Sequence, residues 1–274
     1  PELLDGLIPD FAPHCRRLTP GPGYLESLTE DNVELVKTSI KRFTSGGIET
    51  VDGRTFDFDA IFCATGANTD LVPPFSIKAR GIDLHEAWKP GGKWGFPYTY
   101  FGLAAPGFPN LFFLAGPHAT GPSGTVPHGV ETSLAYFAQV FRKVSSQGYK
   151  SIVPSKEATD DFVDYSDAFF PTTVLTDNCS SWNNGGVPGQ RIHGLWPGSA
   201  AHFTIARREP RWEDFEFERE HKGNRFAYFG NGYTEAELDD STDLTSYLRA
   251  PGQEVDLRDL HERWWDVPGA EKKP

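Results

Sequence analysis

The sequence predicts an α/β fold, because two short apolar runs each end at a glycine and the second is followed by an amphipathic helix. The first run lies in FDFDAIFCATGANTD, where Ala60 to Ala64 is continuously apolar and Thr65-Gly66 ends it. The second is FPNLFFLAGP, residues 108–117, and helically spaced apolar residues follow from Val130 to Arg142. Such runs are typical of strands buried on both faces, and a glycine at the carboxyl end lets a ligand approach closely. We therefore expect a ligand near these two glycine turns.

Short strands are expected before the first glycine turn. Tyr24 begins a helical turn or two, and the alternating segment NVELVKTSI follows it. Asp52-Gly53 is a strong two-residue hairpin signal between alternating segments. Residues 33–64 are therefore predicted to form three successive strands.

The remaining chain is predicted to be loop-rich. Residues 67–102 are rich in Pro, Gly and aromatic side chains and are expected to be irregular, and surface rather than core. Gly148 is expected to end the helix after the second run, and residues 155–166 to form a further helix with an acidic face. From Phe170 onward, turn-forming residues dominate.

Composition and charge exclude several classes of partner. The 274 residues are 38% hydrophobic, which is ample for a core, and the formal charge of −12 argues against nucleic acid as a partner. No apolar run approaches the ~20 residues that a membrane-spanning helix needs. We predict a cytoplasmic protein with neither a nucleic-acid nor a membrane partner.

The three cysteines show no pattern of a disulfide framework. Cys15, Cys63 and Cys179 are odd in number and widely spaced. Disulfide scaffolds and metal sites usually show even counts or close pairs. The cysteines are therefore predicted to be reduced thiols, and no metal site is expected.

The segment with Ala64, Thr65 and Gly66 resembles the ATG motif of class B flavoprotein monooxygenases, the flavin-containing and Baeyer–Villiger enzymes that use FAD and NADPH. The resemblance extends over PDFAPHCRRLTPGPGYLESLTEDNVELV upstream and TYFGLAAPGFPNLFFLAGPHATGPSGTVPHGVETSLAYF downstream, roughly residues 9 to 248. The family's two G-x-G-x-x-G fingerprints and its F-x-G-x-x-x-H-x-x-x-W signature do not occur in this sequence. The chain therefore resembles the carboxyl-terminal half of such an enzyme.

This resemblance implies a partial fold of two dinucleotide-binding domains. Residues 1–66 would form the carboxyl-terminal part of the NADPH-binding domain, ending in the ATG motif. Residues 67–150 would form the carboxyl-terminal part of the FAD-binding domain. Residues 151–274 would form a loop-rich region with a lid over the substrate and cofactor, and a tail.

The resemblance also implies which residues form the site. Arg17 takes the place of the catalytic arginine, which stabilises negative charge on the oxygenated flavin, and Arg16 that of the basic residue meeting the NADPH phosphate. A guanidinium suits both roles because it stays charged and donates in a planar fork. Trp182 takes the place of the lid tryptophan, whose flat face closes over a ring. The other implied cofactor contacts are Ala64, Thr65, Gly66, Gly116, Pro117, Thr125 and Val126.

Plainer explanations exist for several of these features. Arg16 and Arg17 also fit a solvated surface pair. His118 and His128, in a loop rich in Pro and Gly, fit hydrogen-bonding spacers better than acid–base groups. Gly230-Asn231-Gly232 lacks the third glycine of a dinucleotide fingerprint and no apolar strand precedes it.

Three functions remain open at this point. The first is an FAD- and NADPH-dependent monooxygenase that inserts oxygen beside a ketone, or oxidises a heteroatom, in an apolar small molecule. Because the pyrophosphate-binding fingerprints are missing, the second is a flavin-free isomerase or cyclase. The third is a partner subunit of a split monooxygenase, or an inactive truncation. The missing half would then come from a second chain, and a homo-oligomer is a further alternative.

Overall fold

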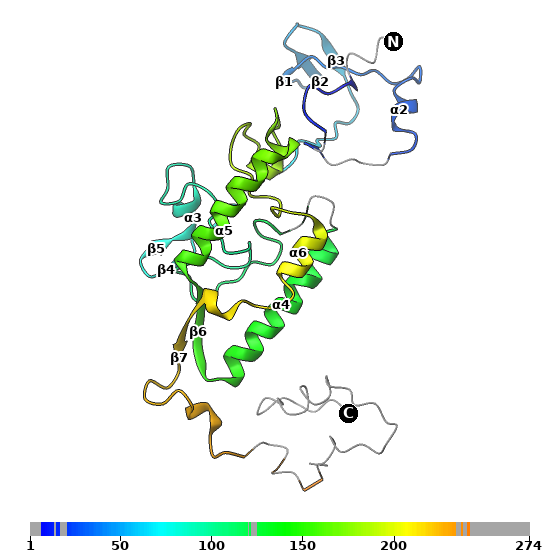
Figure 1. Ribbon diagram of the computed structural model, residues 1–274. Coiled ribbons are helices and arrows are strands. Elements are labelled where there is room, and N and C mark those ends of the chain that lie inside the picture. Colours follow the sequence, from blue (N-terminus) through cyan, green and yellow to red (C-terminus); the bar gives the residue numbers. More distant parts are fainter. Residues whose placement is uncertain are drawn as a thin grey trace, which may run out of the picture. The chain divides into compact units, whose positions relative to one another are not determined.

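The computed structural model of this chain describes residues 7–13, 15–16, 21–119, 121, 125–233, 237 and 240–241. It divides into two compact units, drawn in Figure 1. Unit 1 comprises Pro1–Leu71 and Phe169–Ile192, and unit 2 comprises Val72–Ala168 and His193–Pro274. Each unit is described by itself.

Unit 1 contains a small antiparallel sheet with the strand order β1-β2-β3. The strands are β1 (Ile40–Phe43), β2 (Gly47–Thr50) and β3 (Thr55–Asp57). Asp52-Gly53 forms the turn between β2 and β3, with Gly53 at φ 88°. The three strands and this hairpin are confirmed, but they are shorter than predicted. The unit also contains helix α2 (Tyr24–Ser27) and the 3₁₀ turns η1 (Phe170–Thr172), η2 (Val174–Thr176) and η3 (Trp182–Asn184).

The predicted buried strand at Ala60 to Ala64 is wrong. This segment lies outside any sheet, and its side chains are exposed, with Ile61 at 41% and Phe62 at 93%. A strand buried on both faces needs hydrogen-bonded neighbours and covering layers. Nothing in the described part of unit 1 supplies them, so the apolar run is left in solvent.

Unit 2 is a mixture of helices and short antiparallel strand pairs, β4 with β5 and β6 with β7. Its elements, in chain order, are β4 (Lys78–Ala79), β5 (Ile82–Asp83), α3 (Leu84–Trp88), α4 (Val126–Ser146), β6 (Tyr149–Pro154), α5 (Lys156–Phe169, whose last residue falls in unit 1), α6 (Ala200–Ala206), η4 (Trp212–Asp214), β7 (Phe215–Arg219) and η5 (Ala227–Phe229).

The core of unit 2 draws heavily on the segment predicted to be surface. One cluster joins Tyr100 and Leu103 to Tyr136 and Val140 of α4, and another is built on Trp88 and neighbouring residues of the same segment. The prediction that residues 67–102 are surface rather than core is therefore wrong, whereas their backbone is irregular as predicted, apart from β4, β5 and α3. Aromatic side chains bury large areas from irregular backbone, and such burial leaves no periodic pattern in the sequence.

Helix α4 is the longest element and packs against β6. It begins before the predicted residue because Thr125 caps it, with its hydroxyl accepting a hydrogen bond from the backbone N–H of His128. Gly148, at φ 63°, follows its end as predicted. Helix α5 confirms the predicted helix over residues 155–166.

The predicted strand at residues 108–117 is also wrong. Only an isolated bridge joins Phe112 to Ala104 there, and the rest of the segment is irregular. The run nevertheless contributes to the core, since Phe108 is buried. Among the residues that the structure describes, no helix is long and apolar enough to cross a membrane, and no group of His, Cys, Asp and Glu side chains is arranged to hold a metal ion.

Candidate functional site

The residues expected to form the site fall into both units. Unit 1 holds Arg16, Ala64 to Gly66 and Trp182, and unit 2 holds Gly116, Pro117, Thr125 and Val126. Arg17, the expected catalytic arginine, lies outside the described residues.

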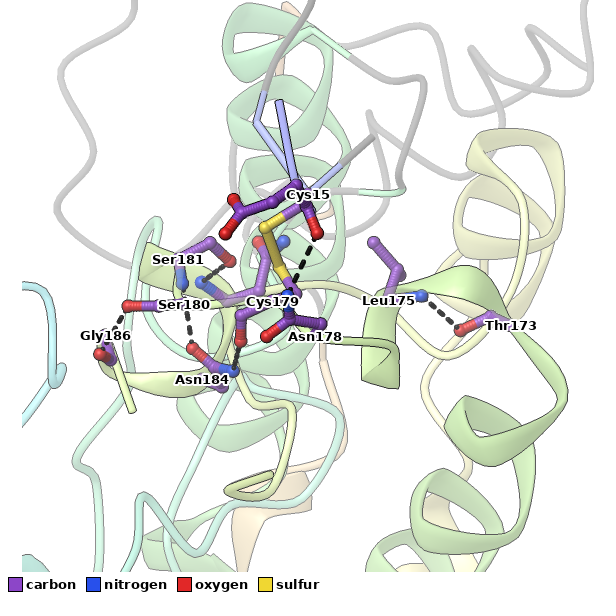
Figure 2. The surroundings of a disulfide bond; sticks show 11 residues. Cys15, Thr173, Leu175, Asn178, Cys179, Ser180, Ser181, Asn184 and Gly186 are labelled. Atoms are coloured by element: carbon purple, nitrogen blue, oxygen red, sulfur yellow. Dashed lines mark hydrogen bonds between the residues drawn. A yellow bond between two sulfur atoms is a disulfide. The ribbon is translucent and has the colours of Figure 1, made fainter. Parts of the chain in front are cut away.

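Trp182 is half-buried and begins the short turn η3. Ser181 and Asn184 brace this turn reciprocally: the Ser181 hydroxyl accepts from the Asn183 N–H at 3.2 Å, and the Asn184 amide oxygen accepts from the Ser181 N–H at 3.0 Å. The Asn184 side chain also donates to the Cys179 carbonyl at 2.7 Å. The turn that contains Trp182 is therefore fixed by the side chains of Ser181 and Asn184, which Figure 2 labels.

A disulfide joins Cys15 to Cys179, next to this turn (Figure 2). Both cysteines are buried, their Cα atoms are 5.4 Å apart, and Cys63 is an exposed free thiol. The prediction that all three cysteines are reduced is thus wrong for two of them. The partners are 164 residues apart in sequence, so spacing carried no signal for a pair that only the tertiary fold brings together.

The disulfide links the segment of the basic pair to the Trp182 turn. Arg16 follows Cys15 directly and is exposed, with its guanidinium 6.0 Å from the centre of the Phe11 ring. Nearby, the Asn178 side chain donates to the Asp10 carbonyl at 3.0 Å. Two connections therefore hold the Arg16 segment against the chain just before Trp182.

Ala64, Thr65 and Gly66 form an exposed stretch outside the sheet. Gly66 has φ 82°, which favours glycine, and no described atom lies within 4 Å of the place its Cβ would occupy. Within unit 1 the glycine therefore serves the backbone conformation and leaves open space beside it.

The loop at Gly116 and Pro117 is packed backbone against backbone. A Cβ on Gly102 would lie 1.8 Å from the Pro117 carbonyl oxygen, and a Cβ on Gly116 would lie 2.7 Å from Cβ of Phe113. Neither position accepts a side chain. The base of the loop is therefore fixed by contacts that only glycine permits.

Arg207 supports this loop through hydrogen bonds. The sequence analysis did not identify it. Its guanidinium donates to the His118 carbonyl at 3.0 Å, to the Ser133 hydroxyl at 3.1 Å, and to the Phe101 carbonyl. The side chain is 1% exposed, no carboxylate is paired with it among the described residues, and burial lowers its pKa to about 9. The Arg207-Arg208 doublet was the only sequence signal, and it looks the same as a surface pair.

His118 and His128 both make hydrogen bonds that support the loop. The His118 N–H donates to the His193 carbonyl at 2.8 Å, and its ring Nδ1 lies 2.7 Å from the Leu195 carbonyl oxygen. The His128 ring Nε2 lies 2.8 Å from the Thr204 hydroxyl of α6. Thr125 caps α4 and Val126 is exposed at the helix start, so the end of the loop leads into the positive end of a long helix.

Each unit, taken by itself, offers features that suit part of a flavin cofactor. Unit 2 provides closely packed backbone at Gly116 and the start of α4. Unit 1 provides the flat ring of Trp182, and the Asn183 amide oxygen there is buried without a hydrogen-bond partner in the described chain. A cofactor amide or ring N–H is a donor of the kind that this oxygen lacks. The pyrophosphate half is different, since no G-x-G-x-x-G turn is present in the sequence to bind it.

Comparisons with known proteins agree on one family. No protein-family model matches the chain. The FAD-binding monooxygenase moxY of Dothistroma septosporum is 30% identical over 275 residues, which cover 99% of this chain and 42% of that protein. The FAD-binding monooxygenase tazF of Aspergillus terreus is 33% identical over 251 residues, covering 90% of this chain and 44% of that protein.

A solved structure gives the same result in three dimensions. The oxidised steroid monooxygenase bound to NADP matches with a TM-score of 0.67 and 27% identity, over 80% of this chain and 42% of that one. The chain thus spans about two fifths of the length of the relatives it matches.

Proposed function

We propose that this chain, a homologue of the FAD-binding monooxygenases of the Baeyer–Villiger type, supplies the arginine, one wall of the flavin site and the lid of such an enzyme. The observation that carries the proposal is the alignment of 99% of the chain with a monooxygenase relative. Since the chain spans 42% of that relative, residues that bind the pyrophosphates of FAD and NADPH would come from polypeptide outside this sequence.

Each part of the chain has a distinct role in this proposal. Bound FAD would supply the oxygen-activating redox chemistry. The loop fixed by Gly102 and Arg207 would place its backbone against the flavin ring. Arg17 would stabilise negative charge that develops on oxygen, because a guanidinium remains protonated in a water-poor site. Trp182, on its braced turn, would cover the ring and exclude water.

Flavin retention tests the proposal. The chain is purified alone, and also after co-expression with a polypeptide that carries both G-x-G-x-x-G fingerprints of a relative; FAD is added, the excess is removed, and the absorbance spectrum is recorded. We expect flavin bands in the complex and NADPH oxidation that depends on a ketone. A folded complex without flavin absorbance bands would contradict the proposal.

Two variants separate the arginines within that complex. Arg17→Ala is expected to keep the flavin bands and to lower ketone oxidation by about 100-fold or more, as for loss of a charge-stabilising donor. Arg16→Ala, the matched neighbour, is expected to raise the KM for NADPH and to leave the rate at saturating NADPH nearly unchanged.

Exposed apolar side chains favour the related possibility of a partner subunit. Phe43, Ile61 and Phe62 are exposed in unit 1, and Leu134 and Phe141 are exposed on α4 in unit 2. Apolar surface of this kind is typical of contact with another polypeptide. The co-expression experiment covers this candidate too, because a partner subunit binds the second polypeptide and completes its flavin site. No described observation favours the flavin-free isomerase or cyclase.

A further inference from the structure

Unit 2 contains an open pocket of about 500 Å³ that takes no part in the proposed flavin site. It lies between α5, α6 and η4, and none of the residues expected to contact a cofactor lines it. The volume falls within the range of small-molecule pockets.

The floor of the pocket is aromatic. The Phe101 ring stands edge-to-face against the rings of Phe162 and Trp196, with ring centres 5.1 and 5.4 Å away. Tyr100 stacks on Phe101 at 4.4 Å, and Tyr165 extends the aromatic surface at the pocket edge. Such a floor offers π faces and apolar area to a flat or aliphatic body.

The rim of the pocket is acidic. Four carboxylates line it, Glu157, Asp161, Glu213 and Asp214, against a single guanidinium, Arg211. Arg211 is already occupied, at 2.9 Å from an Asp214 oxygen and 3.3 Å from a Glu213 oxygen. Glu157 and Asp161, one turn apart on α5, have no ion-pair partner in the described part of the chain.

The other basic groups near the pocket do not neutralise it. The His202 Nδ1 accepts a hydrogen bond from the Trp196 indole at 3.0 Å, which is the arrangement of a neutral imidazole. Arg207 does not line the pocket, but its guanidinium lies 5.3 Å from the centre of the Trp196 ring. Even when Arg207 is counted with Arg211, there are two guanidinium groups for four carboxylates. A net charge of −2 remains around an aromatic floor.

From this combination we propose that the pocket binds a small organic monocation, an amine carried on an aromatic or compact apolar body. The ammonium group would lie at the rim beside Glu157 and Asp161, where carboxylates attract it and solvent still reaches it. The apolar body would lie on Phe101, Phe162 and Trp196, which offer it aromatic surface. An anion of the same shape is repelled. None of the residues expected to contact a cofactor lines this site.

Isothermal titration calorimetry of the full chain at low ionic strength tests the proposal. The probe is 2-phenylethylamine, and its comparators are 2-phenylethanol, which is neutral, and 3-phenylpropionate, which is an anion. We expect saturable binding of the amine at least tenfold tighter than that of the alcohol, no binding of the anion, and weaker amine binding as salt is raised. No saturable heat with the amine, or equal affinity for amine and alcohol, overturns the proposal.

Variants on one exposed helix face locate the site. Glu157→Gln combined with Asp161→Asn is expected to lower amine affinity about tenfold and to leave the alcohol unaffected. Asp164→Asn removes a charge from the same helix outside the pocket lining and is the matched control, with affinity unchanged. Equal affinities in the double variant and the control, with unchanged circular dichroism, would place the binding elsewhere and contradict the proposal.

Discussion

At the scale of single residues, Arg207 is a fully buried guanidinium. It places three donors on groups from three separate segments while buried and without a carboxylate partner. Burial of an unpaired cation is costly, and these hydrogen bonds offset that cost. Arg207 therefore supports the loop at Gly116 to His118.

Arg207→Lys is expected to lower the free energy of unfolding by about 3 kcal/mol, because an ammonium group cannot reproduce the planar fork and leaves buried acceptors unpaired. Arg208→Lys, at the exposed neighbouring position, is expected to change it by less than about 0.5 kcal/mol. Urea unfolding followed by circular dichroism measures both. Equal effects at the two positions would show that the hydrogen bonds of Arg207 contribute nothing to the free energy of unfolding.

Two buried phenols give a pH dependence. The Tyr100 hydroxyl donates to Asp214 at 2.6 Å and the Tyr98 hydroxyl donates to Asp160, and burial together with these carboxylates raises the pKa of both phenols above 10. A group whose pKa is higher in the folded state binds more protons there than in the unfolded chain. Its stabilisation is complete below pH 10 and is lost as the pH rises above that value.

Tyr100→Phe should therefore flatten the decline of stability between about pH 9 and 11.5, by up to about 1.4 kcal/mol for each pH unit above 10. Arg207 changes stability in the opposite sense over this range, since its pKa is lowered, so the difference between variant and parent is the quantity to measure. Tyr228→Phe, which alters a partly exposed phenol, is the control. Parallel pH curves for parent and Tyr100→Phe would refute the assignment.

At the scale of elements, two loops are fixed by close packing and side-chain hydrogen bonds instead of by strand pairing. Gly102 approaches Pro117 more closely than any side chain allows, and the Trp182 turn is fixed by Ser181 and Asn184. Irregular backbone can thus present a flat ring and a close-packed loop without regular secondary structure around them.

Gly102→Ala should destabilise unit 2 by more than Gly91→Ala. Both glycines have positive φ, at 68° and 81°, so both substitutions carry the same conformational cost of about 1 kcal/mol. Only at position 102 would the new Cβ also meet a carbonyl oxygen, whereas nothing lies within 4 Å at position 91. We expect an additional loss of about 2 kcal/mol at position 102, measured by urea unfolding. Equal losses of stability at the two positions would mean that the loop at Pro117 moves to accommodate the new Cβ at no cost in free energy.

The disulfide can be tested by thiol labelling, with the free thiol of Cys63 as an internal control. Alkylation of the native chain followed by mass spectrometry should label exposed Cys63 alone, and reduction should expose Cys15 and Cys179 as well. Cys179→Ser should lower stability by up to roughly 5 kcal/mol, the chain-entropy value for so long a loop. Labelling of all three cysteines without reductant would show that the pair is not bonded in solution.

At the scale of the whole molecule, apolar surface remains exposed on both units. Phe62, in the run that follows the β1-β2-β3 sheet, is the most exposed of the large apolar side chains that the structure describes. Exposed apolar runs favour association with other polypeptide. This agrees with a chain that spans two fifths of its relatives' length.

The isolated chain is therefore expected to self-associate as its concentration rises, in a manner visible by sedimentation velocity. Phe62→Ser should reduce this association several-fold, because the most exposed of the described large apolar side chains is removed. Val51→Ser, at an exposed position in the hairpin turn, should have little effect. Association that is the same for parent and Phe62→Ser would locate the contact on another surface.

Local patterns in the sequence were enough for several elements. The amphipathic spacing after Val130, the acidic helix that begins at Lys156, the Asp52-Gly53 hairpin and Gly148 after α4 all depend on neighbours in the chain. Hydrogen bonds and φ preferences of nearby residues decide such features, so the sequence determines them. The resemblance to flavoprotein monooxygenases likewise came from linear motifs, and homologues confirm it.

Only the tertiary structure determined which segments distant in sequence contact one another. The Cys15–Cys179 bond, the hydrogen bonds of Arg207 and the burial of aromatic residues within residues 67–102 join positions far apart in sequence, and no local pattern marks them. The apolar runs at residues 60–64 and 108–117 show the converse, because their composition predicts buried strands and their partners determine whether a strand forms. Strand pairing and burial are properties of the assembled fold, since each needs a second surface that the segment itself does not contain.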